Sequence, residues 1–173
     1  MVSTTTGTWE DYQGLPDDVP AEYIDGKVLV NPRPTRIHQR VTHRLARLLE
    51  DSCDLAGAEV VVEWAWKPSD DEFSPDVLVV PTTDEDVRFT GTPLLAVEVL
   101  STNRAHDLVT KAFKYAEAGL PRYWVVDPTD RTLTEFELTG GVFVERNVVS
   151  GGDEVMLDFG AGTLLFHPQD LFG

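Results

Sequence analysis

Two acidic residues stand inside stretches of the chain that are otherwise apolar. Glu98 interrupts the run of residues 94–100, and Asp76 opens a similar run that continues to residue 80. Such runs predict strands buried in a sheet, where an ionised carboxylate is costly unless it is paired or binds a cation. The stretch between the two acids is long enough for both strands to lie side by side. Since carboxylate oxygens suit Mg²⁺ or Mn²⁺, the pair predicts a site for a divalent cation.

A cation held in this way could act on a phosphodiester bond. It would polarise a phosphoryl oxygen, lower the pKa of an attacking water and stabilise the leaving oxygen. The segment after Glu98 predicts a helix over residues 103–118, and Lys111 lies one to two turns into it. From there the ammonium group could reach back to the strand end and stabilise the charge of the transition state.

Each of these features also has a structural interpretation. Glu98 could be a core acid held by hydrogen bonds, although the second acid, Asp76, favours the cation site. Lys111 follows Asp107 by four residues, a spacing that also gives an exposed ion pair on a helix. Glu22 could add a third acid to the site or merely precede a hairpin. His38, near a predicted helix start, could join the site or serve in capping and packing.

Charge is strongly segregated along the chain. The formal net charge of −16 over 173 residues argues against broad affinity for nucleic acid, because phosphates would be repelled. Residues 31–49 nevertheless contain no Asp or Glu. Their arginines recur at helical spacing: Arg36, Arg40, Arg44 and Arg47. This stripe could contact DNA, or it could be a solvated helix face.

The elements that must position these residues predict one α/β domain with a mixed sheet. Residues 1–14 are polar and predict a flexible tail, so the domain spans residues 15–173. Asp25 and Gly26 predict a hairpin turn. Thr35 predicts the cap of a helix running to about residue 54, with its apolar face made by residues 37, 41, 45 and 48. Further strands are expected at 58–67, 122–127, 132–138, 142–148 and 163–166.

Cysteine content and hydropathy suggest the cytoplasm. Cys53 is the single cysteine, which excludes an internal disulfide. The first ten residues lack the basic start and apolar core of a signal peptide. No apolar run approaches the roughly 20 residues that span a bilayer, so no membrane association is expected.

Taken together, the motifs resemble the Uma-two family of restriction endonucleases, within the PD-(D/E)XK nuclease superfamily. The segments that carry the resemblance are Glu22 to Gly26, His38, Pro75 to Val77, Val97 to Ser101, Asp107 with Lys111 and Tyr115, and Gly119 with Tyr123 to Pro128. The resemblance implies a restriction-endonuclease-like fold and Mg²⁺-dependent cleavage of DNA. It also implies that Glu22 and His38 belong to the catalytic set.

One position departs from the general nuclease pattern. A lysine normally stands two residues after the glutamate, where this chain has Leu100. The family resemblance implies that Lys111 supplies the missing lysine from the helix. We therefore expect a DNA endonuclease, with a homodimer plausible because cutting both strands favours two sites. The rival hypotheses are an inactive relative that binds a protein or nucleic acid, and a phosphoesterase acting on RNA or a nucleotide.

Overall fold

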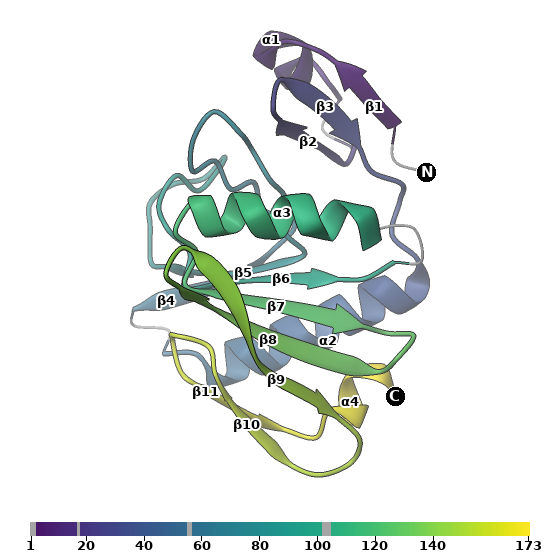
Figure 1. Cartoon of the computed structure of the whole chain (residues 1–173), viewed down its shortest axis with the longest axis vertical. Helices are drawn as coiled ribbons and strands as arrows, with labels where there is room; N and C mark the ends of the chain where they lie inside the picture. Colours follow the sequence, from purple (N-terminus) through teal and green to yellow (C-terminus); the bar gives the residue numbers. More distant parts are fainter. Residues whose placement is uncertain (1–2, 17, 55–56, 102–104) are drawn as a thin grey trace.

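The computed structural model describes residues 3–16, 18–54, 57–101 and 105–173, with no side-chain description at 105–107. Its centre is a six-stranded mixed sheet with helices on both faces, as expected (Figure 1). In spatial order the strands are β4 (Ala58–Val62), β5 (Val77–Pro81), β6 (Leu95–Val99), β7 (Arg122–Asp127), β8 (Thr132–Thr139) and β9 (Val142–Ser150). No helix among these residues is long and apolar enough to cross a membrane.

Strand β6 is the middle of this sheet and is buried along its whole length. It pairs antiparallel with β5 and parallel with β7. Helix α3 (Ala105–Glu117) makes the crossover between the two parallel strands, as such a connection requires. Gly119 ends the helix region with a φ of +76°, a conformation that glycine adopts without strain. Residues 103 and 104 of the predicted helix lie outside the described residues.

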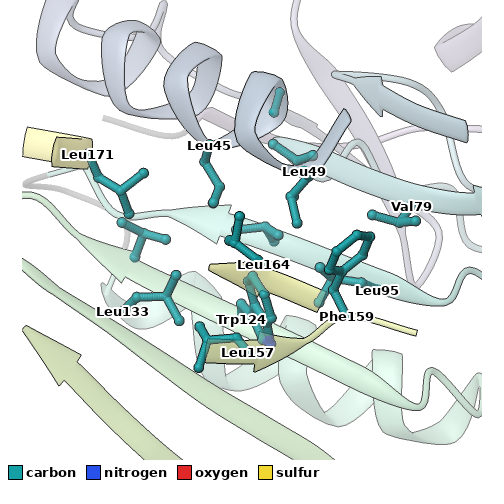
Figure 2. Close-up of a cluster of buried hydrophobic side chains, with 14 of the residues drawn as sticks. Leu45, Leu49, Val79, Leu95, Trp124, Leu133, Leu157, Phe159, Leu164 and Leu171 are labelled. Carbon is teal, nitrogen blue, oxygen red and sulfur yellow. The ribbon is translucent and has the colours of Figure 1, made fainter. Parts of the chain in front are cut away.

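Helix α2 (Arg36–Ser52) covers the opposite face of the sheet from α3. Thr35 caps it by accepting a hydrogen bond from the backbone N–H of His38 over 3.2 Å. Leu45 and Leu49 point from α2 into the core cluster that also contains Val79 and Leu95 (Figure 2). The predicted apolar face is partly wrong, because Ile37 is 56% exposed while His38 is buried.

Residues 3–14 do not form the tail that was predicted for residues 1–14. A second, three-stranded sheet contains β1 (Ser3–Thr6), β3 (Lys27–Val30) and β2 (Ala21–Ile24), in that order. Helix α1 (Trp9–Gln13) follows β1 and is capped by Thr8. The predicted turn at Asp25 and Gly26 is present, and both residues have positive φ. The strand β1 escaped prediction because its partner β3 is distant in sequence.

One further prediction is wrong, and two more elements were not predicted. The strand expected over 58–67 ends at Val62, because Glu63 adopts a left-handed φ of +49° that breaks the ladder. At the C-terminus, β11 (Thr163–Phe166) is present as predicted and pairs with β10 (Val155–Asp158). Strand β10 and helix α4 (Gln169–Phe172) were not predicted from the sequence. Together they help to close the core under α2.

Candidate active site

Asp76 and Glu98 lie opposite each other at one end of the central sheet. The antiparallel register of β5 and β6 pairs Val77 with Val97. Continued by one residue, it places Asp76 across from Glu98, and residues in this relation share a sheet face. The backbone N–H of Val99 donates to Asp76 Oδ2 over 2.7 Å, which fixes the orientation of that carboxylate. Only 4% of Asp76 and 2% of Glu98 is exposed.

Lys111 enters the site from α3. Its Nζ lies 3.1 Å from Glu98 Oε1 and 2.9 Å from Glu22 Oε1. The lysine is buried, and its side chain reaches back toward the strand end, as the sequence suggested. The side chain of Asp107, its alternative ion-pair partner, lies outside the described residues.

Glu22 reaches the site from β2 and binds three donors. Besides Lys111, its Oε1 accepts the backbone N–H of Ser74 over 2.8 Å, and its Oε2 accepts Asn31 Nδ2 over 3.1 Å. A carboxylate with both oxygens occupied by hydrogen-bond donors is well suited to hold a lysine in place. The N-terminal sheet thereby contributes directly to the site beside β6.

His38 approaches Asp76 from the first turn of α2. Its Nε2 lies 3.2 Å from Asp76 Oδ1, and the ring is 3% exposed. A cavity of about 370 Å³ opens onto these two residues, and Asn31, Glu63 and Ser74 also line it. The site therefore has a route to solvent on the side of Asp76.

Burial and neighbouring carboxylates perturb the acid–base chemistry here. Burial raises the pKa of Glu98 to about 7, against the opposing effect of Lys111 and with support from Asp76 and Glu22. Burial also raises the pKa of Tyr115, whose hydroxyl donates to Glu98 Oε1 over 2.8 Å. Perturbed groups of this kind concentrate at functional sites.

The donor set fits a hard divalent cation. Glu22 and Glu98 contact the ammonium group of Lys111, and Asp76 lies across from Glu98, so acidic groups outnumber lysines in this part of the described chain. When all three carboxyl groups are ionised, above the raised pKa of Glu98, negative charge exceeds the charge of Lys111. A bound cation would neutralise this excess, and Asp76 and Glu98 would hold it. Within the described ranges, no three His, Cys, Asp or Glu residues already form a metal-binding group. Asp76 and Glu98 would therefore need further ligands, from another side chain, water or substrate, to complete the shell.

Comparison with known proteins identifies the family. A family model described as "Putative restriction endonuclease" matches residues 9–164. The chain belongs to this family, Uma2. A crystal structure from Anabaena variabilis, described as a "putative nuclease belonging to DUF820", superposes with a TM-score of 0.76 at 22% identity, covering 95% of this chain and 97% of that one. No curated protein sequence matches. The superposition shows the shared fold, and the family match supports an enzyme of the nuclease type.

This Uma2 protein also places residues at the site that sequence reasoning did not assign to it. Tyr115 follows Lys111 by four residues, so both lie on one face of α3, and this spacing was a usable signal. Asn31 follows β3 and bonds Glu22. It gave no comparable signal, because a polar residue before a proline is typical of any turn.

The arginines of α2 in this Uma2 protein differ in their surroundings. Arg36 and Arg40 are exposed, and Arg44 donates to the carbonyl of Leu171 over 3.1 Å. Arg47 lies 3.8 Å from Asp51, one turn along the helix. Arg36, Arg40 and Arg44 line a cavity of about 500 Å³. Glu63 lines both this cavity and the one that contains Asp76.

Proposed function

We propose that this protein is a Mg²⁺-dependent endonuclease that hydrolyses phosphodiester bonds in DNA. The observation that carries the proposal is the cluster of Asp76, Glu98 and Lys111. Two acids lie opposite each other on adjacent strands, and a buried lysine reaches one of them from the following helix. The match to a family described as restriction endonucleases supports the same reaction class.

Each side chain has a distinct role in this proposal. When bound, Mg²⁺ or Mn²⁺ supplies Lewis-acid polarisation of the scissile phosphate and activation of water. Asp76 and Glu98 hold the cation. Lys111 stabilises the negative charge that develops on the phosphate, because its ammonium group is preorganised and needs little rearrangement during reaction. Glu22 and Tyr115 fix Lys111 and Glu98 through the hydrogen bonds and ion pair described above.

DNA is the proposed substrate because a cavity lined by arginines adjoins the cavity that contains Asp76. Arg36, Arg40 and Arg44 line the cavity that shares Glu63 with the Asp76 cavity. Phosphate contacts by arginine position a duplex without reading its sequence. We propose that this face, with Arg47 farther along, guides the backbone toward the site.

Cleavage of DNA tests the proposal directly. Purified protein would be incubated with supercoiled plasmid, single-stranded DNA and RNA in Mg²⁺, Mn²⁺ or EDTA. We expect nicking or linearisation of the plasmid with either cation, none with EDTA, and none for Asp76→Asn or Glu98→Gln. The matched control is Glu135→Gln, which changes a buried carboxyl of β8 outside the cluster and should cut normally.

Three results would overturn the proposal in different ways. Folded protein that binds Mn²⁺ but cuts no nucleic acid would favour a non-catalytic relative that binds a partner. Cleavage of RNA but not DNA would show that RNA is the substrate. Cleavage that persists in both acid variants would place the chemistry elsewhere.

We also propose a homodimer in the cytoplasm. Cleavage of both strands of a duplex favours two sites, which two copies of the chain would provide. Sedimentation velocity at micromolar concentration should therefore give the mass of two chains of 19.2 kDa. A single species with the mass of one chain, both with and without DNA, would contradict the dimer.

A further inference from the structure

We infer that His38 is a ligand of the divalent cation, which makes the site a mixed nitrogen and oxygen centre that prefers Mn²⁺ to Mg²⁺. This inference rests on the proposed function, because it assigns a further ligand to the cation held by Asp76 and Glu98. It arises from the contact between His38 and Asp76, and from two nearby side-chain atoms that make no hydrogen bond among the described residues, His38 Nδ1 and Asn31 Oδ1.

The ring of His38 is buried with one nitrogen left unsatisfied. It is 3% exposed, and Nε2 contacts Asp76 Oδ1, but Nδ1 makes no hydrogen bond to another described residue. A buried polar atom left without a hydrogen-bond partner destabilises the fold, so a native protein retains it for a reason. A small rotation of the helix would bury the apolar Ile37 in place of the histidine, but Ile37 is exposed.

The position of the ring points to the same cation as the acids. His38 Nε2 lies 3.2 Å from Asp76 Oδ1, while the other oxygen of Asp76 is oriented by the N–H of Val99. The N-cap bond from Thr35 fixes the first turn of α2, so the backbone that carries His38 is defined. Imidazole and carboxylate therefore meet at one point in the fold.

A second buried atom without a partner lines the same cavity. Asn31 donates through Nδ2 to Glu22, and its Oδ1 makes no hydrogen bond among the described residues. The cavity of about 370 Å³ brings Asn31, His38 and Asp76 to a common space. An amide oxygen, an imidazole nitrogen and a carboxylate can together serve a cation or its coordinated water.

The ligand types determine which cation is preferred. Mg²⁺ favours oxygen ligands and retains its water, whereas imidazole suits first-row transition metals. Adding one nitrogen to a carboxylate set should therefore strengthen the binding of Mn²⁺ more than that of Mg²⁺. Other transition metals higher in the Irving–Williams series should bind more tightly still.

Pulsed electron paramagnetic resonance of bound Mn²⁺ tests this assignment without any cleavage assay. The full chain, first treated with EDTA and then dialysed, would be loaded with Mn²⁺ alone. We expect modulation from a directly coordinated ¹⁴N nucleus, replaced by the ¹⁵N pattern in protein that carries ¹⁵N-labelled histidine. This labelling comparison uses the wild-type chain, so it decides the question even if a His38 variant fails to fold.

Variants then assign the nitrogen to His38. In His38→Gln the modulation should disappear, and calorimetry should show Mn²⁺ affinity falling on the order of tenfold to a hundredfold, with a smaller loss for Mg²⁺. The matched control is His43→Gln, which removes an exposed histidine from the same helix and should change neither measurement.

The possible failures are distinguishable. Bound Mn²⁺ without histidine modulation in the wild-type protein would overturn the role of His38 and leave the proposed nuclease intact. Modulation that survives in folded His38→Gln would also overturn it. No binding of Mn²⁺ or Mg²⁺ to the folded wild-type chain would overturn the metal-dependent function itself.

Discussion

Lys111 is held between two acids, and this setting determines what its removal should do. Glu22 fixes it from β2, and Glu98 fixes it from β6. Because both partners are buried, the ammonium group can neither leave the site nor be replaced by solvent at little cost. A lysine in such a position can act on charge in a bound phosphate, and it also compensates the charges of its neighbours.

We therefore predict that Lys111→Ala lowers the cleavage rate by about a hundredfold or more, as the loss of one preorganised donor does. Calorimetry should show that Mn²⁺ still binds, because lysine is not a ligand. The control is Lys114→Ala. Lys114 pairs with Asp25 and Asp71 outside the cluster, so this variant should lose some stability but keep its rate. If Lys111→Ala cleaves DNA at the wild-type rate, Lys111 has only a structural role as the ion-pair partner of the acids.

Glu98 gives the site a predictable dependence on pH. Its pKa is raised by burial from 4.5 to about 7 in the folded protein. The folded state therefore holds a proton that the unfolded state has released between these values. As a result, stability is lost as the pH rises from about 4.5 to about 7, and the loss is complete above that range.

Glu98→Gln has no carboxyl group to ionise, so it does not lose this stability. We therefore predict that the variant has a higher melting temperature than the wild-type apo protein, and that the difference in melting temperature grows from about pH 5 to about pH 8. Differential scanning calorimetry in EDTA measures this difference. Excess Mn²⁺ should shrink or reverse it, because only the wild-type site binds the cation with both acids. A difference that is the same at every pH in this range would show that Glu98 titrates normally.

Helix α2 serves the site on two sides. Its buried face presents His38 to Asp76, and its outer face carries the arginines. The two functions share one rigid element, so the arginines keep a fixed position relative to the acids. Arg44 also ties α2 to α4 through the carbonyl of Leu171, which makes it a poor site for a charge-reversal experiment.

The double variant Arg36→Glu with Arg40→Glu is the cleaner test of DNA contact, because both side chains are exposed and the bond from Arg40 to the carbonyl of Gly173 is long, at 3.4 Å. We predict weaker DNA binding and a shallower dependence of binding on salt. The slope of log K against log salt concentration should fall by about 0.9 for each phosphate that the protein no longer neutralises. Fluorescence anisotropy at several salt concentrations measures both. The control, Arg122→Glu with Arg146→Glu, makes the same change in net charge at the start of β7 and on β9. If the salt dependence of DNA binding has the same slope in both double variants, the arginine face of α2 has no specific role in binding DNA.

Over the whole molecule, local signals predicted the elements best. Strands β6, β7 and β11 and the turn at Asp25 and Gly26 follow from short apolar runs and turn chemistry, which act within a few residues. Strand β1 could not be predicted in this way, because it exists through pairing with β3. The rotation of α2 was also missed: helical spacing fits both Ile37 and His38, and only packing against Asp76 and the sheet selects the histidine.

The candidate site likewise contains residues that local sequence predicts and residues that only the tertiary structure places. Asp76 and Glu98 could be predicted because they are acids in apolar strands, and the register of the sheet brings them together. Asn31 could not be predicted, because its role depends on where β2 and β3 meet α3 and β6. Figure 1 shows this N-terminal sheet beside α3, distant from β6 in sequence but adjacent to the site in space.

The proposed function depends above all on Asp76 and Glu98 sharing one divalent cation beside Lys111. A crystal of the full chain soaked in Mn²⁺ and measured near the manganese absorption edge tests it most directly. We predict an anomalous peak in contact with one oxygen from each of these carboxylates, and no such peak in a crystal of Asp76→Asn. A peak elsewhere, or none at a Mn²⁺ concentration that saturates calorimetry, would contradict the account.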